Sequence, residues 1–252
     1  MKPGQLLLVP NTLDLGTETV DLQEVLPLGV LRQAAALAHW AAEDARSARA
    51  FLKRVDAVVP LAMPLQSIGI RELPRPRKGS REPVPAAEWL ALLQPALDGH
   101  DLGLISEAGL PAVADPGALL VAAAHQAGVT VRPLAGASSL LLALAASGLN
   151  GQSFAFVGYL PQDAAARTAR LRELEALSRR LGQTQMVIET PYRNGALFAA
   201  MLGALAPATQ LSVSVGLTLP GGWTRSHRIT GWRQTPCELP DRVPAVFSLL
   251  AT

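Results

Sequence analysis

Short apolar runs alternate with helical patterns through the middle of this chain, and this alternation limits its fold more than any other feature. Residues 101–106 and 129–134 are predicted as strands, and a helix closed by Gly128 separates them. A second helix, residues 138–147, follows at once. Strands that alternate with helices are typical of a parallel sheet covered by helices on its faces. The sequence therefore predicts an α/β fold.

The N-terminal part fits the same pattern. Residues 5–9 form an apolar run that stops at Pro10 and is predicted as a buried strand. Residues 67–73 are a weaker strand candidate, and residues 84–98 are predicted as a helix. The basic, proline-containing segment 71–81 is either a solvated surface loop or a loop that faces the substrate.

The pattern restarts after Gly151. Strands are predicted at 153–159 and 185–189, and Asp163 is expected to cap a helix between them. The apolar stripe of that helix is predicted to consist of Leu171, Leu174, Leu177 and Leu181. A helix at 194–206 precedes three β-like runs, 210–218, 224–232 and 244–251, which favour antiparallel strands. We therefore expect two α/β domains, 1–134 with a mostly parallel sheet and 135–252 with a mixed sheet.

Composition excludes several classes of protein. The chain has 252 residues, 49% hydrophobic and 17% charged, which is typical of a globular protein. Its net charge of +2 neither indicates nor excludes nucleic-acid binding. The single cysteine, Cys237, excludes an internal disulfide framework and favours a reducing, cytoplasmic location. The N-terminal apolar run is too short for a signal peptide, and residues 138–149 are too short for a membrane span. The histidines lack metal-ligand spacing, so we expect no metal.

Breaks in regular structure fall at the ends of several predicted strands. They lie at 10–11, 106–109, 134–139 and 189–191. In open α/β sheets, ligands bind outside the carboxyl ends of the strands. The breaks contain small residues and few charges, and neither a GxGxxG fingerprint nor a GxxxxGK[ST] loop is present. This lining favours an uncharged heterocycle over a polyphosphate.

Several ordered motifs resemble the tetrapyrrole methylase superfamily, above all its branch similar to ribosomal RNA small subunit methyltransferase I. The motifs are "LISEAGLPAVADPG", "RPLAGASSLLLALAASGL", "FAFVGYLP" and "QTQMVIETPYRN", which resemble the branch's "SDAGTPxxSDPG", "PLPGPSA", "GFLP" and "YESPHR". "LLLVPNTLDLG" and "AAEDARSARAFLK" also resemble its "VPTPIGN" and "AAEDTRHTGKLL". The resemblance covers nearly the whole chain.

The resemblance implies S-adenosyl-L-methionine as methyl donor, bound in a cleft between two α/β domains, and usually a homodimer. It also implies a strand at "HWAA" that ends at Glu43-Asp44, although periodicity alone predicts one long helix over 31–55. Matching the motifs residue by residue assigns donor contacts to one group of residues: Pro10, Ile105, Ser106, Glu107, Ala108, Leu110, Ser138, Ser139, Glu189, Leu217 and Thr218.

A carboxylate near the transferred methyl group could accept the proton of a hydroxyl acceptor. Glu43 and Asp44 are the predicted catalytic residues, because they stand where the branch has "EDTR", and Arg46 is a candidate contact for an RNA phosphate. Asp115 and Glu189 are further acidic residues near strand ends, with Asp115 expected to be a turn or cap residue.

The chain departs from the branch at several positions. Glu107 replaces the aspartate of "SDAG", and Ala135-Gly136-Ala137 replaces "PGP". The leading hypothesis is methylation of RNA. The resemblance implies ribosomal RNA, because the branch's substrate is the 2′-hydroxyl of a cytidine in small-subunit RNA. Methylation of a tetrapyrrole or another small planar molecule is the alternative enzyme function. A degenerate, non-catalytic donor-binding protein is the third reading.

Overall fold

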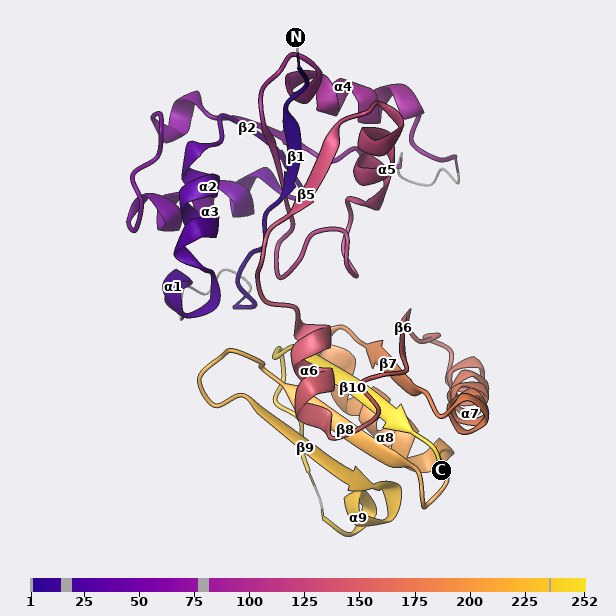
Figure 1. Cartoon of the computed structure of the whole chain (residues 1–252). Coiled ribbons are helices and arrows are strands. Elements are labelled where there is room, and N and C mark those ends of the chain that lie inside the picture. Colours follow the sequence, from indigo (N-terminus) through magenta and orange to yellow (C-terminus); the bar gives the residue numbers. More distant parts are fainter. Residues whose placement is uncertain (1, 15–19, 77–81, 236) are drawn as a thin grey trace. The chain divides into compact units, whose positions relative to one another are not determined.

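The computed structural model describes residues 2–14, 20–76, 82–235 and 237–252 (Figure 1). Residues 77–81 of the basic segment therefore lie outside the described residues. The chain divides into two compact units, Met1–Ser138 and Ser139–Thr252, which we call unit 1 and unit 2. The sequence prediction placed the division after Leu134. Residues 135–138 group with unit 1 because Gly136 lies directly against Pro10 of the first strand's end.

Unit 1 has an α/β architecture in which the strands alternate with helices. Its strands are β1 (Gln5–Leu8), β2 (His39–Ala42), β3 (Gly69–Glu72), β4 (Leu102–Ile105) and β5 (Thr130–Pro133). Its helices are α1 (Leu22–Val25), α2 (Leu28–Ala36), α3 (Ala45–Asp56), η1 (Leu65–Ser67), α4 (Ala86–Leu97) and α5 (Ala118–Gln126). The separate strand β2 and helix α3 confirm the strand at "HWAA" that the resemblance implies. The single long helix that periodicity predicts over 31–55 is wrong.

The five strands of unit 1 form one parallel sheet in the order β3-β2-β4-β1-β5. Helices cover both faces, with α2 and α3 on one side and α4 and α5 on the other (Figure 1). Because side chains alternate along a strand, neighbouring residues enter different cores. Leu7 and Trp40 pack against α2 and α3, whereas Leu6 and Ala41 pack against α4 and α5. Burial on both faces explains why the inner strands β1, β2 and β4 are largely apolar, whereas the edge strands β3 and β5 are mostly exposed and carry polar residues.

Unit 2 begins with a helix and continues with a mixed sheet. Its helices are α6 (Ser139–Ser147), α7 (Ala164–Leu181), η2 (Pro191–Arg193), α8 (Asn194–Ala204) and α9 (Ile229–Gln234). Its strands are β6 (Phe154–Tyr159), β7 (Thr184–Ile188), β8 (Gln210–Val215), β9 (Trp223–Arg228) and β10 (Ala245–Leu250). The strand order is β6-β7-β10-β8-β9, with β6 and β7 parallel and the other pairs antiparallel. The predicted mixed sheet is confirmed.

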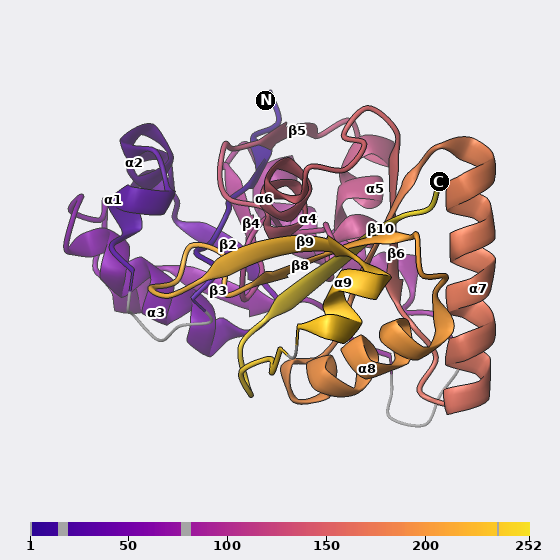
Figure 2. The same ribbon diagram turned by 90° about the horizontal axis from the view of Figure 1, so that it is seen from below.

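The two faces of the unit 2 sheet carry different cores. The larger core joins Val187, Val213 and Phe247 to α7, α8 and α9 (Figure 2). On the opposite face, α6 packs on Met186 and Val246 in a smaller core. Among the described helices of unit 2, α6 is the one that packs on this face of the sheet.

Two predictions for unit 2 are corrected. The buried stripe of α7 consists of Leu171, Leu174, Glu175 and Ser178, whereas Leu181 is 52% exposed. Glu175 can be buried because its carboxylate accepts hydrogen bonds from the Ala206 backbone and the Thr209 hydroxyl. Residues 224–232 were predicted as one β-like run, but α9 starts at Ile229. The Trp232 side chain of this helix is buried in the larger core of unit 2.

No helix among the described residues is long and apolar enough to cross a membrane.

Candidate functional site

The carboxyl ends of the parallel strands bring several predicted site residues to one edge of the unit 1 sheet. Pro10 follows β1, Glu43 and Asp44 follow β2, and Ser106 and Glu107 follow β4. Strands β1, β4 and β2 are direct neighbours, so these segments lie side by side. Open α/β sheets bind their ligands at this edge.

Asn11 holds two of these segments together. Its buried side-chain amide donates to the carbonyl oxygens of Ser106 (3.1 Å) and Glu107 (3.0 Å). Its backbone N–H donates to the carbonyl of Gly109 (2.8 Å), and the N–H of Gly109 donates back to the carbonyl of Thr12 (3.3 Å). The sequence analysis did not single out Asn11 as a site residue. The signal available was a polar residue immediately after a strand-ending proline.

A buried ion pair also anchors residues 12–14, which continue the segment after β1. The Thr12 hydroxyl donates to the Asp14 carboxylate (2.6 Å), and the Arg54 guanidinium lies 3.1 Å from that carboxylate. Arg54 also donates to the carbonyl of Val20 (2.6 Å). Because Arg54 belongs to α3, the ion pair ties the segment after β1 to a helix on the face of the sheet.

Three carboxylates gather beside Ser106. The backbone N–H of Glu107 donates to a carboxylate oxygen of Glu43 (3.2 Å). Burial, followed by the negative charges of Glu43 and Glu107, raises the pKa of Asp115 to about 6, against the opposing effect of the Ser106 hydroxyl. The Ser106 hydroxyl is itself buried and makes no well-formed hydrogen bond within the described residues. This edge therefore carries three carboxylates and a buried hydroxyl that has no well-formed hydrogen bond.

Asp44 is the N-cap residue of α3. Its carboxylate accepts hydrogen bonds from the backbone N–H (2.7 Å) and the hydroxyl (3.0 Å) of Ser47. These bonds lower the pKa of Asp44. A carboxylate that caps a helix and has a lowered pKa is a weak base. The catalytic role predicted for Asp44 stays a prediction. Because the Asp44 carboxylate caps α3, Glu43 is the better candidate for the proton acceptor.

The loop after β4 departs from regular backbone geometry at four positions. Gly109, Ala112, Ala114 and Gly117 all have positive φ angles. For an alanine this left-handed conformation costs about 1 kcal/mol or more, so the loop stores strain that its surroundings must hold. The side chain of Ile105 is buried in the core, while Ala108 and Leu110 are partly exposed on the loop. Any ligand contact of Ile105 must therefore come from its backbone.

The loop after β5 approaches the end of β1 closely. The N–H of Leu134 donates to the carbonyl of Leu8 (3.0 Å). A Cβ atom at Gly136 would lie 2.2 Å from the Cβ of Pro10, so only glycine fits there. Ser138 is buried at the end of this loop, and Ser139 starts α6.

In unit 2, the predicted donor contacts follow β7 and β8. Both carboxylate oxygens of Glu189 are occupied. One accepts from the backbone (2.8 Å) and hydroxyl (3.2 Å) of Thr190, and the other pairs with Arg193 at 2.7 Å. Leu217 packs against the α6 core, and Thr218 has a φ of 68°. Tyr192, in the turn that follows Glu189, is 72% exposed.

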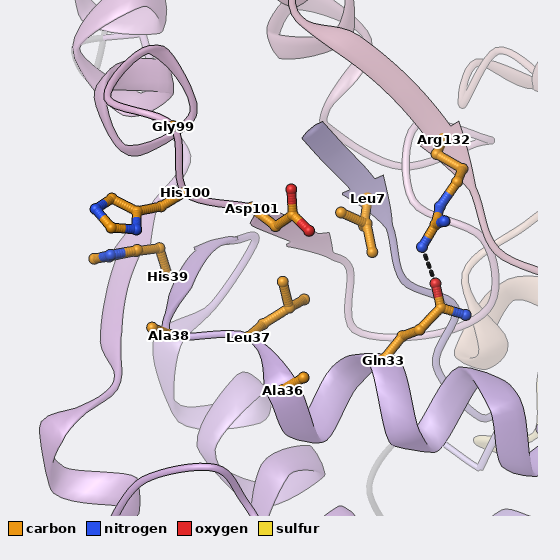
Figure 3. Close-up of a pocket in the computed structure, with 10 residues that line it drawn as sticks. All are labelled: Leu7, Gln33, Ala36, Leu37, Ala38, His39, Gly99, His100, Asp101 and Arg132. Atoms are coloured by element: carbon orange, nitrogen blue, oxygen red, sulfur yellow. Dashed lines mark hydrogen bonds between the residues drawn. The ribbon is translucent and has the colours of Figure 1, made fainter. Parts of the chain in front are cut away.

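A separate pocket of about 370 Å³ lies at the opposite, amino end of the unit 1 sheet (Figure 3). Its lining includes His39 at the start of β2 and His100 and Asp101 just before β4. Arg132 donates a hydrogen bond to Gln33 there, and the rings of His39 and His100 lie 5.5 Å apart. None of the predicted donor contacts lines this pocket. It is therefore distinct from the carboxyl-end site.

Comparisons with known proteins support the resemblance seen in the motifs. No protein-family model matches the chain. A "Ribosomal RNA small subunit methyltransferase I" of Mycobacterium bovis is 38% identical over 183 residues, which are 70% of this chain and 58% of the relative. One of the same name from Micromonospora olivasterospora is 44% identical over 108 residues, or 43% of this chain and 33% of the relative. The chain thus spans between a third and three fifths of the length of these relatives.

The fold also matches solved structures. A uroporphyrin-III C-methyltransferase from Thermus thermophilus, solved in complex with S-adenosylhomocysteine, superposes with a TM-score of 0.55 at 20% identity. The match covers 98% of this chain and 97% of that one. The chain has the fold of that methyltransferase, and its resemblance to the tetrapyrrole methylase superfamily is confirmed in sequence and in fold.

Proposed function

We propose that this chain is an S-adenosylmethionine-dependent methyltransferase of the tetrapyrrole methylase superfamily and that it methylates ribosomal RNA. The observation that carries the proposal is the 38% identity over 183 residues to a relative named for this activity. The finer parts of the proposal are a ribose 2′-hydroxyl as acceptor, a cytoplasmic location and a homodimeric state.

The carboxyl edge of the unit 1 sheet suits S-adenosylmethionine. When bound, this donor supplies an electrophilic methyl group on a positively charged sulfur. The carboxylates of Glu43, Glu107 and Asp115 create a negative potential that favours such a cation. The buried Ser106 hydroxyl needs a hydrogen-bond partner, which a polar ligand would provide. Ala108 is partly exposed and has only a methyl side chain, which leaves its backbone open to close approach.

The residues proposed to hold the donor are those given by the motifs. In unit 1 they lie in the loops after β1, β4 and β5: Pro10, Ile105, Ser106, Glu107, Ala108, Leu110 and Ser138. In unit 2 they are Ser139, Glu189, Leu217 and Thr218. Since the Glu189 carboxylate is already paired with Arg193, its proposed contact comes from the backbone.

Glu43 is the proposed proton acceptor. A hydroxyl group loses its proton as it is methylated, and a positioned carboxylate that accepts this proton typically contributes 10²- to 10⁴-fold in rate. The Glu107 N–H holds the Glu43 carboxylate at the strand edge. The Arg75 guanidinium holds the Glu43 carbonyl (2.9 Å), so the residue is fixed through both its main chain and its side chain.

Transfer of a radiolabelled methyl group to RNA from a strain that lacks this gene tests the proposal. We expect label in ribosomal RNA with the wild type, and a loss of about 100-fold or more with Glu43→Gln at unchanged donor affinity. Glu88→Gln, an exposed position on α4, is the matched control and should retain full activity. Label that persists with Glu43→Gln would remove Glu43 as the base.

Binding of the methyl donor and the identity of the methyl acceptor are tested by separate experiments. Calorimetry that detects no S-adenosylmethionine binding at millimolar ligand would contradict the whole proposal. Ser138→Trp should abolish donor binding, because Ser138 is buried beside the proposed site. Resistance of the labelled nucleotide to alkaline hydrolysis would support a 2′-O-methyl group, because that group blocks the attack of the 2′-oxygen on the phosphate.

One observation favours a tetrapyrrole as the alternative substrate. The solved uroporphyrin-III C-methyltransferase, whose name gives this substrate class, shares its fold with 98% of this chain. Label in a tetrapyrrole and none in RNA would establish this alternative. For the proposed homodimer, light scattering should give about twice the chain mass of 26.5 kDa, and a monomer mass at all concentrations would contradict it.

A further inference from the structure

Strand β9 forms an exposed edge of the unit 2 sheet. It pairs with β8 on one side, and among the described strands none pairs with its other side (Figure 1). Residues 225–228 are all exposed, in contrast to the buried strands beside them. An open sheet edge normally carries charged residues or a partner.

The segment around β9 is strongly basic. Residues 223–234 contain Arg225, Arg228 and Arg233 and no acidic residue, so they carry a formal charge of +3 in a chain whose net charge is +2. Arg233 is engaged with the carbonyl oxygens of Leu202 and Leu205. Arg225 and Arg228 remain exposed toward solvent.

Planar side chains accompany this charge. Because side chains alternate along a strand, Trp223, Arg225 and His227 share one face of β9. The Arg225 guanidinium lies 4.7 Å from the centre of the Trp223 ring. The His227 ring lies at 89° to the Trp232 ring, with 5.0 Å between the ring centres. The stack with Trp223 orders the Arg225 side chain in the unbound protein, which lowers the entropy cost of using it in binding.

We propose that the β9 surface, made of Trp223, Arg225 and His227 on one face of the strand and of Arg228 on its other face at the strand's end, binds a single-stranded segment of the RNA substrate along the open edge. Single-stranded RNA is bound by stacking of its bases on aromatic rings and arginine planes, and by arginine contacts to its phosphates. An ordered guanidinium beside an aromatic ring offers both kinds of contact. This inference rests on the proposed RNA substrate and adds a binding surface within unit 2.

The alternative to RNA binding is that the β9 arginines only protect the sheet edge. Arginines on an edge strand can also serve only to prevent pairing with another sheet. In that case their neutralisation would promote aggregation and leave RNA binding unchanged. The two roles therefore predict different measurements on the same variants.

Fluorescence anisotropy with a labelled single-stranded RNA of mixed sequence tests the proposal on the full chain. We expect Arg225→Gln and Arg228→Gln each to raise the Kd about 3- to 10-fold and to reduce the slope of log K against log salt by about 0.7 per lost phosphate contact. Arg172→Gln removes the same charge from an exposed position on α7 and should leave the Kd nearly unchanged. Equal losses in all three variants, or no loss in any, would overturn the proposal.

Two further measurements separate this inference from the proposed function. If the wild type binds RNA through β9 but shows no S-adenosylmethionine binding, the methyltransferase proposal fails and the surface stands. If it methylates RNA and the β9 variants bind RNA like Arg172→Gln, the surface fails and the enzyme stands. Phosphatidylserine vesicles provide the competing anionic partner, and β9-dependent binding to vesicles without binding to RNA would overturn the inference.

Discussion

The two units hold their candidate site loops in different ways. In unit 1, the polar contacts at the strand ends join residues far apart in sequence. Asn11 bonds to the loop after β4, Glu107 bonds to Glu43, and Arg54 pairs with Asp14. In unit 2, the bonds that the described residues make to the Glu189 carboxylate come from its sequence neighbours Thr190 and Arg193. The unit 1 loops therefore depend on the tertiary fold, whereas the Glu189 loop depends mainly on local sequence.

The ion pairs of the two units should differ most in stability. Arg54→Leu leaves the fully buried Asp14 without its cation and should lower the free energy of unfolding by about 3–5 kcal/mol. Arg193→Leu should cost about 1 kcal/mol, because Arg193 is 22% exposed and Glu189 keeps its bonds to Thr190. Urea unfolding of both variants measures the difference. Equal losses would mean that long-range anchoring does not distinguish the two units.

Asn11→Ala should have the next largest effect. It removes three hydrogen bonds of a buried side chain, two to carbonyl oxygens and one from the backbone N–H of Thr12, which should cost about 1–3 kcal/mol. Asn150→Ala is the matched change in unit 2, where a half-buried side chain also makes three hydrogen bonds, most of them at exposed positions. We expect Asn150→Ala to lower the free energy of unfolding less than Asn11→Ala does, as measured by urea unfolding. Asn11→Ala should also weaken donor binding in calorimetry, and a loss of donor affinity equal in both variants would speak against a specific role for Asn11.

The smallest expected effect is a dependence on pH. The folded chain holds the Asp115 proton with a pKa of about 6, above the value of about 3.9 in an unfolded chain. The folded state therefore binds more protons between these values, and stability falls as the pH rises from about 4 to 6. Asp115→Asn removes the ionised form and should add about 1 kcal/mol at pH 8 and almost nothing at pH 4.

Urea unfolding at the two pH values measures this difference. The same stability change at pH 4 and pH 8 would contradict the raised pKa of Asp115. In Glu43→Gln, which removes a negative charge beside Asp115, the fall in stability should occur at lower pH. That shift would link two strand-end loops of unit 1 by charge alone.

The sequence was most informative where structure depends on local pattern. The apolar runs located the strands, and Asp163 was correctly predicted as the cap of α7. The motifs placed Glu43 and Asp44 at the end of a strand, which periodicity alone missed. Leu181 was misassigned because a helical pattern does not reveal that Glu175 and Ser178 find buried partners in later loops and strands.

The site was harder to predict because its contacts cross the chain. The partners of Asn11 lie 95 and 96 residues away, and nothing in its neighbourhood identifies them. The raised pKa of Asp115 depends on Glu43, which follows a different strand. The sequence of β9 contains its arginines, but only the strand order places them on an open sheet edge.

The contact between Gly136 and Pro10 has a practical consequence for engineering the loops at this edge of the unit 1 sheet. A variant library that randomises the loop after β5 would lose nearly every member with a substitution at position 136, because a Cβ there collides with the Pro10 ring. Ala135 and Ala137 already replace the prolines that flank this glycine in the branch's motif. Diversity is therefore best introduced at those two flanking positions, with Gly136 and Pro10 kept together as a fixed pair.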